Sequence, residues 1–223
     1  MSIVVHHLNN SRSQRVLWLL EELGVPYEIK YHKRNPKTHL APPELKAVHP
    51  LGKSPVVVDD GRVLAETGAI VDYLLDTHGN GRLRPPPGTD EWLRFIYWLH
   101  YAEGSAMPPL VMRLIFRVMP RRSPWLLRPL VRRIAERAQA GFVTPQLKLH
   151  MNYWESELQR STWFAGEEFT SADIMMSFPI EVAAVRANAL EGRPKLTAFL
   201  DRIRARPAYQ RAVERGGAFD VVR

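Results

Sequence analysis

Ser11 and Ser13 occupy a position where an anionic group could be held. They follow the apolar segment IVVHHL (3–8) and precede an apolar segment that ends at Leu23. The first segment is typical of a buried strand and the second of a helix, so both serines fall at a helix N-terminus. Free backbone N–H groups and the positive end of the helix dipole favour an anion there. A helix needs only one such cap, and Asn10 or Ser13 could provide it, which leaves Ser11 as a candidate for chemistry.

Two further turns place polar groups at the ends of predicted strands. In KSPVV, a proline opens a strand. A cis bond between Ser54 and Pro55 would leave the Ser54 backbone open to an extended ligand, although only about 5–6% of X–Pro bonds are cis. In LAETGAI, Glu66 and Thr67 open a helix directly after a strand, either as a cap or as a carboxylate-binding turn. Three such turns in one small domain favour a ligand site.

Asp173 is a tempting catalytic carboxylate, but its spacing has a structural explanation. In EFTSADIMMSFP it lies three residues after Thr170, as in a capping box. Phe169 and Ile174 occupy the positions of a hydrophobic staple. We therefore predict that Asp173 is structural.

The elements that position these residues divide the chain into two parts. Residues 1–80 predict an α/β domain in the order βαβ-α-ββα, with a hairpin at Asp60-Gly61. Residues 81–90 are a proline-rich linker, and 91–223 are predicted to be all-helical. Helices are expected over 66–78, 91–119, 124–159, 171–187 and 194–204, with interruptions at Pro108-Pro109 and near 141–145.

Composition excludes several classes of protein. The 223 residues are 45% hydrophobic and 24% charged, as in an ordinary globular protein. The absence of cysteine excludes disulfides, thiolate metal sites and a cysteine nucleophile from this chain. No apolar run reaches the roughly 18 residues of a membrane span, and the N-terminus lacks the features of a secretory signal. We expect a cytoplasmic protein without a metal.

The net charge of +8 is concentrated in one stretch. Residues 104–135 contain no acidic residue, and apolar side chains alternate there with seven arginines. The arginines are Arg113, Arg117, Arg121, Arg122, Arg128, Arg132 and Arg133. A solvated helix face is the simplest interpretation. An anionic membrane, nucleic acid or acidic small ligands could also use such a surface.

Four segments together resemble the cytosolic glutathione transferases, closest to a fungal and bacterial serine-type branch. They are SRSQRVLWLLEELGVPYE, PPELKAVHPLGKSPVV, LAETGAIVDYL and FTSADIMMSFP. The resemblance extends from Val4 to about Tyr209. It implies a thioredoxin-like N-terminal domain, an all-helical C-terminal domain, a homodimer, a role in detoxification, and glutathione as co-substrate.

The resemblance also implies which residues bind the tripeptide. They are Lys53, Ser54, Pro55, Glu66, Thr67 and His39. Pro55 resembles the family's cis proline, beside the Ser54 backbone that would pair with the cysteinyl moiety. Glu66 and Thr67 would hold the γ-glutamyl end. Lys53, together with the histidine, would bind the glycyl carboxylate.

Ser11 resembles the serine that donates to the glutathione sulfur in serine-type members. A free thiol with a pKa near 8.5 is mostly protonated at neutral pH, so a hydroxyl donor at a helix N-terminus would favour the thiolate. The spacing of Ser11 and Arg15 fits this branch, but Ser13 and Gln14 replace its usual proline and cysteine. Ser13, or a backbone N–H, therefore remains a rival partner for the sulfur. Tyrosine-type members have a tyrosine in the first strand, where this chain has histidine.

The leading hypothesis is a glutathione transferase whose thiolate attacks hydrophobic electrophiles held by the helical domain, with peroxide reduction as a side activity. A non-catalytic binder of glutathione or hydrophobic anions is one alternative. Another is an interaction module that contacts an anionic membrane through 113–133. We expect no nucleic-acid partner. The electrophile pocket could use Met107, Leu110, Met112 and Leu114, whose side chains could equally belong to the core.

Overall fold

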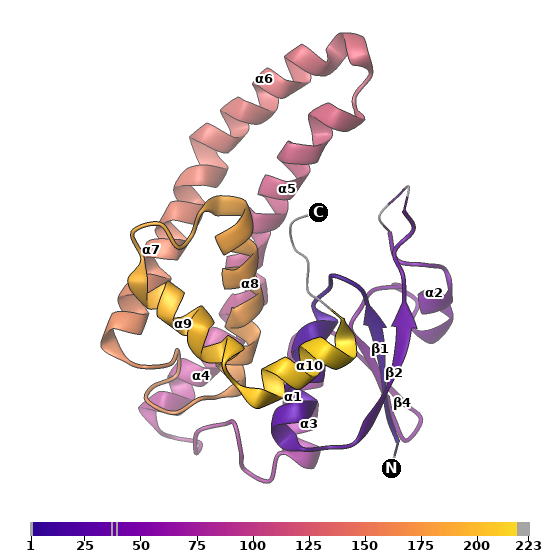
Figure 1. Cartoon of the computed structure of the whole chain (residues 1–223), viewed down its shortest axis with the longest axis vertical. Coiled ribbons are helices and arrows are strands. Elements are labelled where there is room, and N and C mark those ends of the chain that lie inside the picture. The colour runs from indigo at the N-terminus through magenta and orange to yellow at the C-terminus, as the bar shows by residue number, and fades with distance from the viewer. Residues whose placement is uncertain (1, 37, 39, 218–223) are drawn as a thin grey trace.

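The computed structural model describes residues 2–36, 38 and 40–217, and its first part is built on a four-stranded sheet (Figure 1). The strands are β1 (Ile3–Leu8), β2 (Tyr27–His32), β3 (Val56–Asp59) and β4 (Arg62–Ala65). Their order is β2-β1-β3-β4, with β1 parallel to β2 and the other neighbours antiparallel. Asp60 and Gly61 both have positive φ, as a two-residue hairpin turn requires, which confirms the predicted hairpin.

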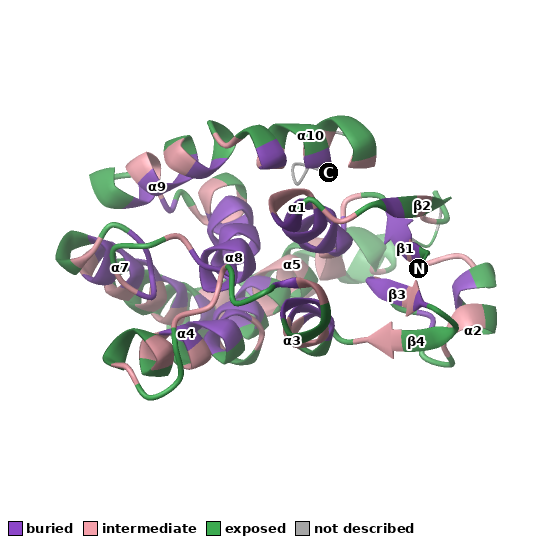
Figure 2. Cartoon of the chain, turned by 90° about the horizontal axis from the view of Figure 1, so that it is seen from below, coloured by how far each residue is buried: buried purple, intermediate pink, exposed green. Residues whose placement is uncertain are grey.

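Three helices complete this part. They are α1 (Ser13–Leu23), α2 (Glu44–Val48) and α3 (Thr67–His78). In Figure 2, α1 and α3 lie between the sheet and the later helices, whereas α2 lies on the other side. Because α1 packs against β1, α3, α8 (Ser171–Ala187) and α10 (Pro207–Gly216), it is buried almost all round. This explains why its sequence has so small a polar face, and the order βαβ-α-ββα is confirmed.

The second part is helical, as predicted. Its other α-helices among the described residues are α4 (Asp90–Tyr101), α5 (Met107–Arg122), α6 (Arg128–Ala138), α7 (Thr144–Arg160) and α9 (Pro194–Arg204). The most continuous burial is in α8, which is buried from Ser171 to Ala183. The core of the helical part therefore forms around α8.

The predicted interruptions take the form of two π-helical segments, Ala102–Ala106 and Gln139–Val143. Each segment directly precedes a helix that begins with proline in its first turn. Proline lacks an N–H and its ring crowds the carbonyl four residues earlier, so the ordinary hydrogen-bond pattern cannot continue there. The widened turns relieve this conflict without ending the helical path.

Asp173 has the structural role that its spacing predicts. Its carboxylate accepts hydrogen bonds from the backbone N–H groups of Phe164 at 2.8 Å and Thr170 at 2.9 Å, and the capping box is present. Burial raises the pKa of Asp173 to about 6, although these hydrogen bonds oppose the shift. The side chain holds the start of α8 against the preceding loop.

Helix α10 is absent from the sequence-based prediction, which ended the helices at Arg204. The structure adds it after Pro207 and packs it along α1. It therefore returns the end of the helical part to the first helix of the sheet domain (Figure 1).

Helices α5 and α6 form a hairpin that projects away from the rest of the molecule (Figure 1). Its tip is a single 3₁₀ turn, Trp125–Leu127. All three tip side chains are exposed, and Trp125 is 73% accessible. No helix among the described residues is both long enough and apolar enough to span a bilayer.

Candidate functional site

The strand register brings the three candidate turns to one end of the sheet. His6 of β1 pairs with Val56 of β3, and Val56 pairs with Ala65 of β4. The end of β1, the beginning of β3 and the end of β4 therefore meet. The Ser11 loop follows β1, Ser54-Pro55 precedes β3, and Glu66 follows β4, so the three candidate turns lie together at this edge of the sheet.

Three serine hydroxyls form a cluster at the N-terminus of α1. The Oγ of Ser11 lies 2.7 Å from Oγ of Ser13 and 3.4 Å from Oγ of Ser54. Ser11 is 5% exposed and Ser13 is fully buried. The Ser13 N–H donates to Ser11 Oγ at 3.3 Å, so Ser11 also satisfies a backbone donor at the helix start. Capping and ligand contact are thus compatible roles for this hydroxyl.

The peptide bond between Ser54 and Pro55 is cis. The Ser54 hydroxyl donates to the His6 carbonyl at 3.1 Å, which fixes the turn beside β1. Among the described residues, neither the N–H nor the C=O of Ser54 has a backbone partner. Both groups are available to pair with an extended ligand.

The turn at Glu66 also has the predicted form. Glu66 has φ 68°, an uncommon conformation for a residue other than glycine, and its side chain is exposed. Thr67 is buried and begins α3, whose first turn contains no acidic residue. An anion at this helix N-terminus would therefore meet backbone donors without a competing carboxylate from that turn.

Of the two candidate cations, Lys53 and His39, only Lys53 lies among the described residues. Lys53 is exposed and next to Ser54, and no ion pair of its ammonium group is found among the described residues. It can therefore reach a carboxylate bound along the Ser54 backbone. His39 lies outside the described residues.

His7 adjoins the serine cluster, a contact that the sequence analysis missed. Its Nδ1 lies 2.9 Å from Oγ of Ser13, and the side chain is 3% exposed. Burial lowers the pKa of His7, the Gly216 backbone acts in the opposite direction, and His32 lowers the pKa further. The neutral imidazole can accept a proton from the hydroxyl cluster. Only the strand alternation, which places His7 and Val5 on one face, hinted at this position.

Residues of the helical part contact the first turn of α1. Arg15 is buried, donates to the Met175 carbonyl at 2.9 Å and forms an ion pair with Glu103. Arg12 lies 3.2 Å from the same carboxylate, and the Arg15 guanidinium lies 5.1 Å from the centre of the Phe178 ring. No sequence pattern indicated a role for Glu103 or Phe178, because both contacts join distant segments.

The four apolar residues proposed for the electrophile pocket divide into two pairs. Met107 and Leu110 are buried in the core. Met112 and Leu114 are only partly buried. The core interpretation therefore applies to the first pair, and only the second retains accessible surface.

The arrangement can stabilise an anion at one point. Hydroxyl donors, the N–H groups at the start of α1 and the positive end of its dipole all lie at the edge where the Ser54 backbone is free. The nearby arginines are engaged by Glu103. Such a site suits the ionised sulfur of a bound peptide thiol.

Comparison with known proteins gives a consistent result over the whole chain. The family model described as glutathione S-transferase, N-terminal domain, matches residues 11–77, and the corresponding C-terminal domain model matches 118–207. Glutathione S-transferase 3 of Schizosaccharomyces pombe is 35% identical over 96% of this chain and 87% of its own length. Glutathione S-transferase 1 of Saccharomyces cerevisiae is 32% identical over 97% and 96%.

Among solved structures, a glutathione S-transferase from Actinobacillus pleuropneumoniae superimposes with a TM-score of 0.82. Its sequence is 34% identical, and the match covers 99% of this chain and 96% of that protein. The fold and both of its parts are therefore shared along the entire length.

Proposed function

Because the chain belongs to the glutathione S-transferase family, we propose that the three turns at this edge of the sheet bind glutathione, with its sulfur at Ser11. The protein is a glutathione transferase with glutathione as co-substrate. The non-catalytic alternative has no support from these relatives, which are named as transferases. The observation that best supports the proposed location is the cluster of three hydroxyls at the N-terminus of α1.

The tripeptide would lie along the edge in an extended conformation. Its cysteinyl backbone pairs with the free N–H and C=O of Ser54, beside Pro55. The α-carboxylate of its γ-glutamyl end meets the N-terminus of α3 at Thr67, and the exposed Glu66 carboxylate faces the ammonium group. Lys53 binds the glycyl carboxylate, with His39 as the second proposed cation.

In this position the thiol is favoured in its ionised form. A hydroxyl donor and a helix N-terminus each stabilise the anion relative to the neutral thiol, and each pKa unit corresponds to about 1.4 kcal/mol. Two such interactions can lower the pKa by roughly one to two units. The thiolate then attacks an electrophilic carbon, and the leaving group departs with its electron pair.

The electrophile would bind between the start of α1 and the helical part. The partly buried Met112 and Leu114 offer apolar surface, which favours a hydrophobic electrophile. Peroxide reduction by the same thiolate is a proposed side activity.

Binding of S-methylglutathione, whose sulfur cannot titrate, tests the location of the site. We expect wild-type protein to be retained on immobilised glutathione and eluted by free glutathione. Glu66→Gln should weaken S-methylglutathione binding about tenfold in calorimetry, because one charge–charge contact is lost.

Glu28→Gln is the matched control. Glu28 is exposed on β2 and pairs in register with Val4, far from the edge where β1 ends. Equal affinities of the two variants, or no retention of wild-type protein, would contradict the proposed site.

Several broader assignments follow from the family and are proposals for this chain. We propose a homodimer that uses exposed apolar rows on the helices, such as Leu130 with Ile134 on α6. We also propose a cytoplasmic protein without a metal, and a division into domains at 1–80, 81–90 and 91–223.

The tip of the α5–α6 hairpin favours one additional partner, an anionic membrane surface. Its exposed Trp125–Leu127 turn offers apolar insertion, and residues 104–135 surround it with arginine and no acidic group. Trp125→Ser with Leu126→Ser should abolish sedimentation with anionic vesicles at low salt. Binding that is retained by this variant, or that shows no salt dependence, would contradict membrane contact.

A further inference from the structure

The buried contact between His7 and the serine cluster has no part in thiolate stabilisation by Ser11 alone. A serine hydroxyl can donate to a thiolate, but it does not remove the proton that the thiol loses. A buried imidazole within hydrogen-bond distance of that cluster can do so. The structure contains such a group two hydroxyls away from the proposed sulfur position.

The chain of contacts is continuous. Ser11 Oγ is 2.7 Å from Ser13 Oγ, which is 2.9 Å from His7 Nδ1. The Leu8 N–H donates to Ser13 Oγ at 3.3 Å and helps to fix the middle hydroxyl. The far side of the imidazole faces the Gly216 backbone on α10, which favours the protonated ring. A proton can therefore pass between Ser11 Oγ, Ser13 Oγ and His7 Nδ1 along hydrogen bonds in either direction.

We propose that His7 receives the proton of the glutathione thiol through Ser13 and Ser11. This proposal rests on the glutathione site described above and assigns an acceptor that the site itself lacks. His7 does not touch the sulfur, so it is a positioning residue that acts through Ser13, whereas Ser11 is the catalytic residue.

The proton transfer balances along the chain. The S–H bond breaks and a new O–H bond forms at Ser11, while Ser11 passes its own proton to Ser13. Ser13 passes its proton to His7 Nδ1. The products are a thiolate that accepts a hydrogen bond from Ser11 and an imidazolium ion at His7. After the C–S bond forms and the leaving group departs as an anion, the proton returns through the two hydroxyls to solvent.

The surroundings of His7 suit an acceptor that is neutral at rest. From β2, the Tyr31 ring lies edge-on at 5.9 Å, and a charge on His32 would oppose a charge on His7. From α1 and α10, the imidazole meets only the Ser13 hydroxyl and the Gly216 backbone among the described contacts. No carboxylate in that set holds the ring in its charged form, so a nearby thiolate is the counter-ion that ionisation requires.

His7→Asn separates a proton-accepting role from a structural one. The asparagine amide can occupy the place of Nδ1 and retain the hydrogen bond with Ser13, but it cannot take up a proton. The measurement is the pKa of enzyme-bound glutathione, from the ultraviolet absorbance of the thiolate against pH, together with the pH profile of kcat/KM for an aryl halide. We expect His7→Asn to raise that pKa by about one unit and to lower the thiolate fraction at pH 7 by roughly three- to eightfold.

Ser13→Ala interrupts the chain at its middle and should produce the same shift. The double variant should shift no further than either single variant, because both remove one pathway. If His7→Asn does not fold, His7→Gln takes its place, because its amide likewise cannot take up a proton. His150→Asn is the matched control, since it replaces a histidine of the helical part that contacts Tyr101 and Trp154 rather than the serines or His7, and it should leave the thiol pKa unchanged.

An unchanged thiol pKa in both His7→Asn and Ser13→Ala would overturn the proposal, and so would additive shifts in the double variant. Binding of S-methylglutathione keeps this failure separate from failure of the site. If wild-type protein does not bind that compound, the proposed location is wrong. If it binds and lowers the thiol pKa in wild type and both variants alike, only the role of His7 is wrong.

Discussion

At the scale of single residues, two serines only two positions apart face different tasks. Ser11 is at the mouth of the cluster, in reach of Ser54, whereas Ser13 is fully buried and in contact with His7. A sulfur can meet Ser11 without displacing the inner hydroxyl. The geometry therefore favours Ser11 over Ser13 as the direct partner of the sulfur.

Ser11→Ala should lower kcat/KM for an aryl halide about 10- to 100-fold, because a hydrogen bond to an anion contributes roughly 1.5–3 kcal/mol. Binding of S-methylglutathione should change little, since its sulfur carries no charge. Steady-state kinetics and calorimetry check the two parts. The control is Ser171→Ala, at a site away from the cluster. It removes a buried hydroxyl that has no hydrogen-bond partner in the described part of the chain. Unchanged turnover in Ser11→Ala would transfer the role to Ser13 or to a backbone N–H.

Sequence reasoning selected the residues of the proposed site that belong to local turns. Ser11, Pro55 and Glu66 each lie where a predicted strand meets a turn, so the local pattern was sufficient to select them. Their functional roles remain proposals. His7 and Glu103 were missed because their significance depends on contacts across the fold. A histidine in an apolar strand gives no sign of which side chain it meets.

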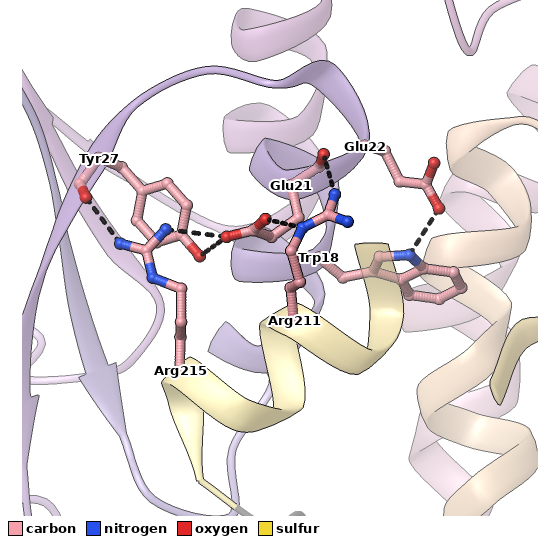
Figure 3. A network of polar contacts seen from close by, with 6 residues as sticks. All are labelled: Trp18, Glu21, Glu22, Tyr27, Arg211 and Arg215. Carbon is pink, nitrogen blue, oxygen red and sulfur yellow. Dashed lines mark hydrogen bonds and ion pairs between the residues drawn. The ribbon is translucent and has the colours of Figure 1, made fainter. Parts of the chain in front are cut away.

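At the scale of elements, charged groups join α10 to α1 (Figure 3), in addition to the contact between the Trp18 and Tyr209 rings. The Glu21 carboxylate accepts hydrogen bonds from Arg211, Arg215 and the Tyr27 hydroxyl, each at 2.8 Å. Arg215 also lies 3.8 Å from the centre of the Tyr27 ring. Burial raises the pKa of Glu21, but the hydrogen bonds outweigh burial and lower it overall.

This composition explains why α10 escaped prediction. Its buried residues are Ala208 and Ala212, both small, and most of its other positions are polar or charged. Periodicity methods look for a row of large apolar side chains, which this helix does not have. In contrast, α8 and α9 have such rows and were predicted with the bounds that the structure shows.

Glu21→Gln should loosen α10 while leaving α9 in place. The amide keeps the size of the side chain but removes the charge that two arginines share, and partial exposure of both arginines limits the loss to about 1–2 kcal/mol. Hydrogen exchange of α10 amides should become faster, as followed by mass spectrometry. Glu214→Gln, which alters an exposed carboxylate on α10 itself, serves as the control. Equal exchange in both variants would argue that apolar contacts hold the helix.

At the scale of the whole molecule, buried histidines link stability to pH. Burial lowers the pKa values of His6, His7, His32 and His150 below the ordinary 6.5. The unfolded chain therefore binds protons at these sites before the folded protein does, and their contribution to stability is lost as pH falls below 6.5. Asp173 and Glu181 act in the opposite sense, since burial raises the pKa of Asp173 to about 6 and also raises that of Glu181, so the folded state takes up these protons first as pH falls.

The urea midpoint should therefore decrease between about pH 7.5 and pH 5.5, where the four histidines outnumber the two opposing carboxyl groups. His32→Asn should reduce this slope, because it removes one of the groups and its stacked contact with His6. Urea titrations at several pH values measure the effect. A midpoint that is flat or rises over this interval would contradict the assignment.

Helix α10, the final element that the structure describes, has a consequence for how the protein is made. The sheet domain emerges from the ribosome first, before the arginines that pair with Glu21 and Glu22 have been translated. Until α10 is made, helix α1 has two carboxylates without their ion-pair partners and an apolar surface that α10 does not yet cover. We expect the sheet domain to depend on chaperones until α10 has been synthesised, so that termination before α10 yields a product marked for degradation.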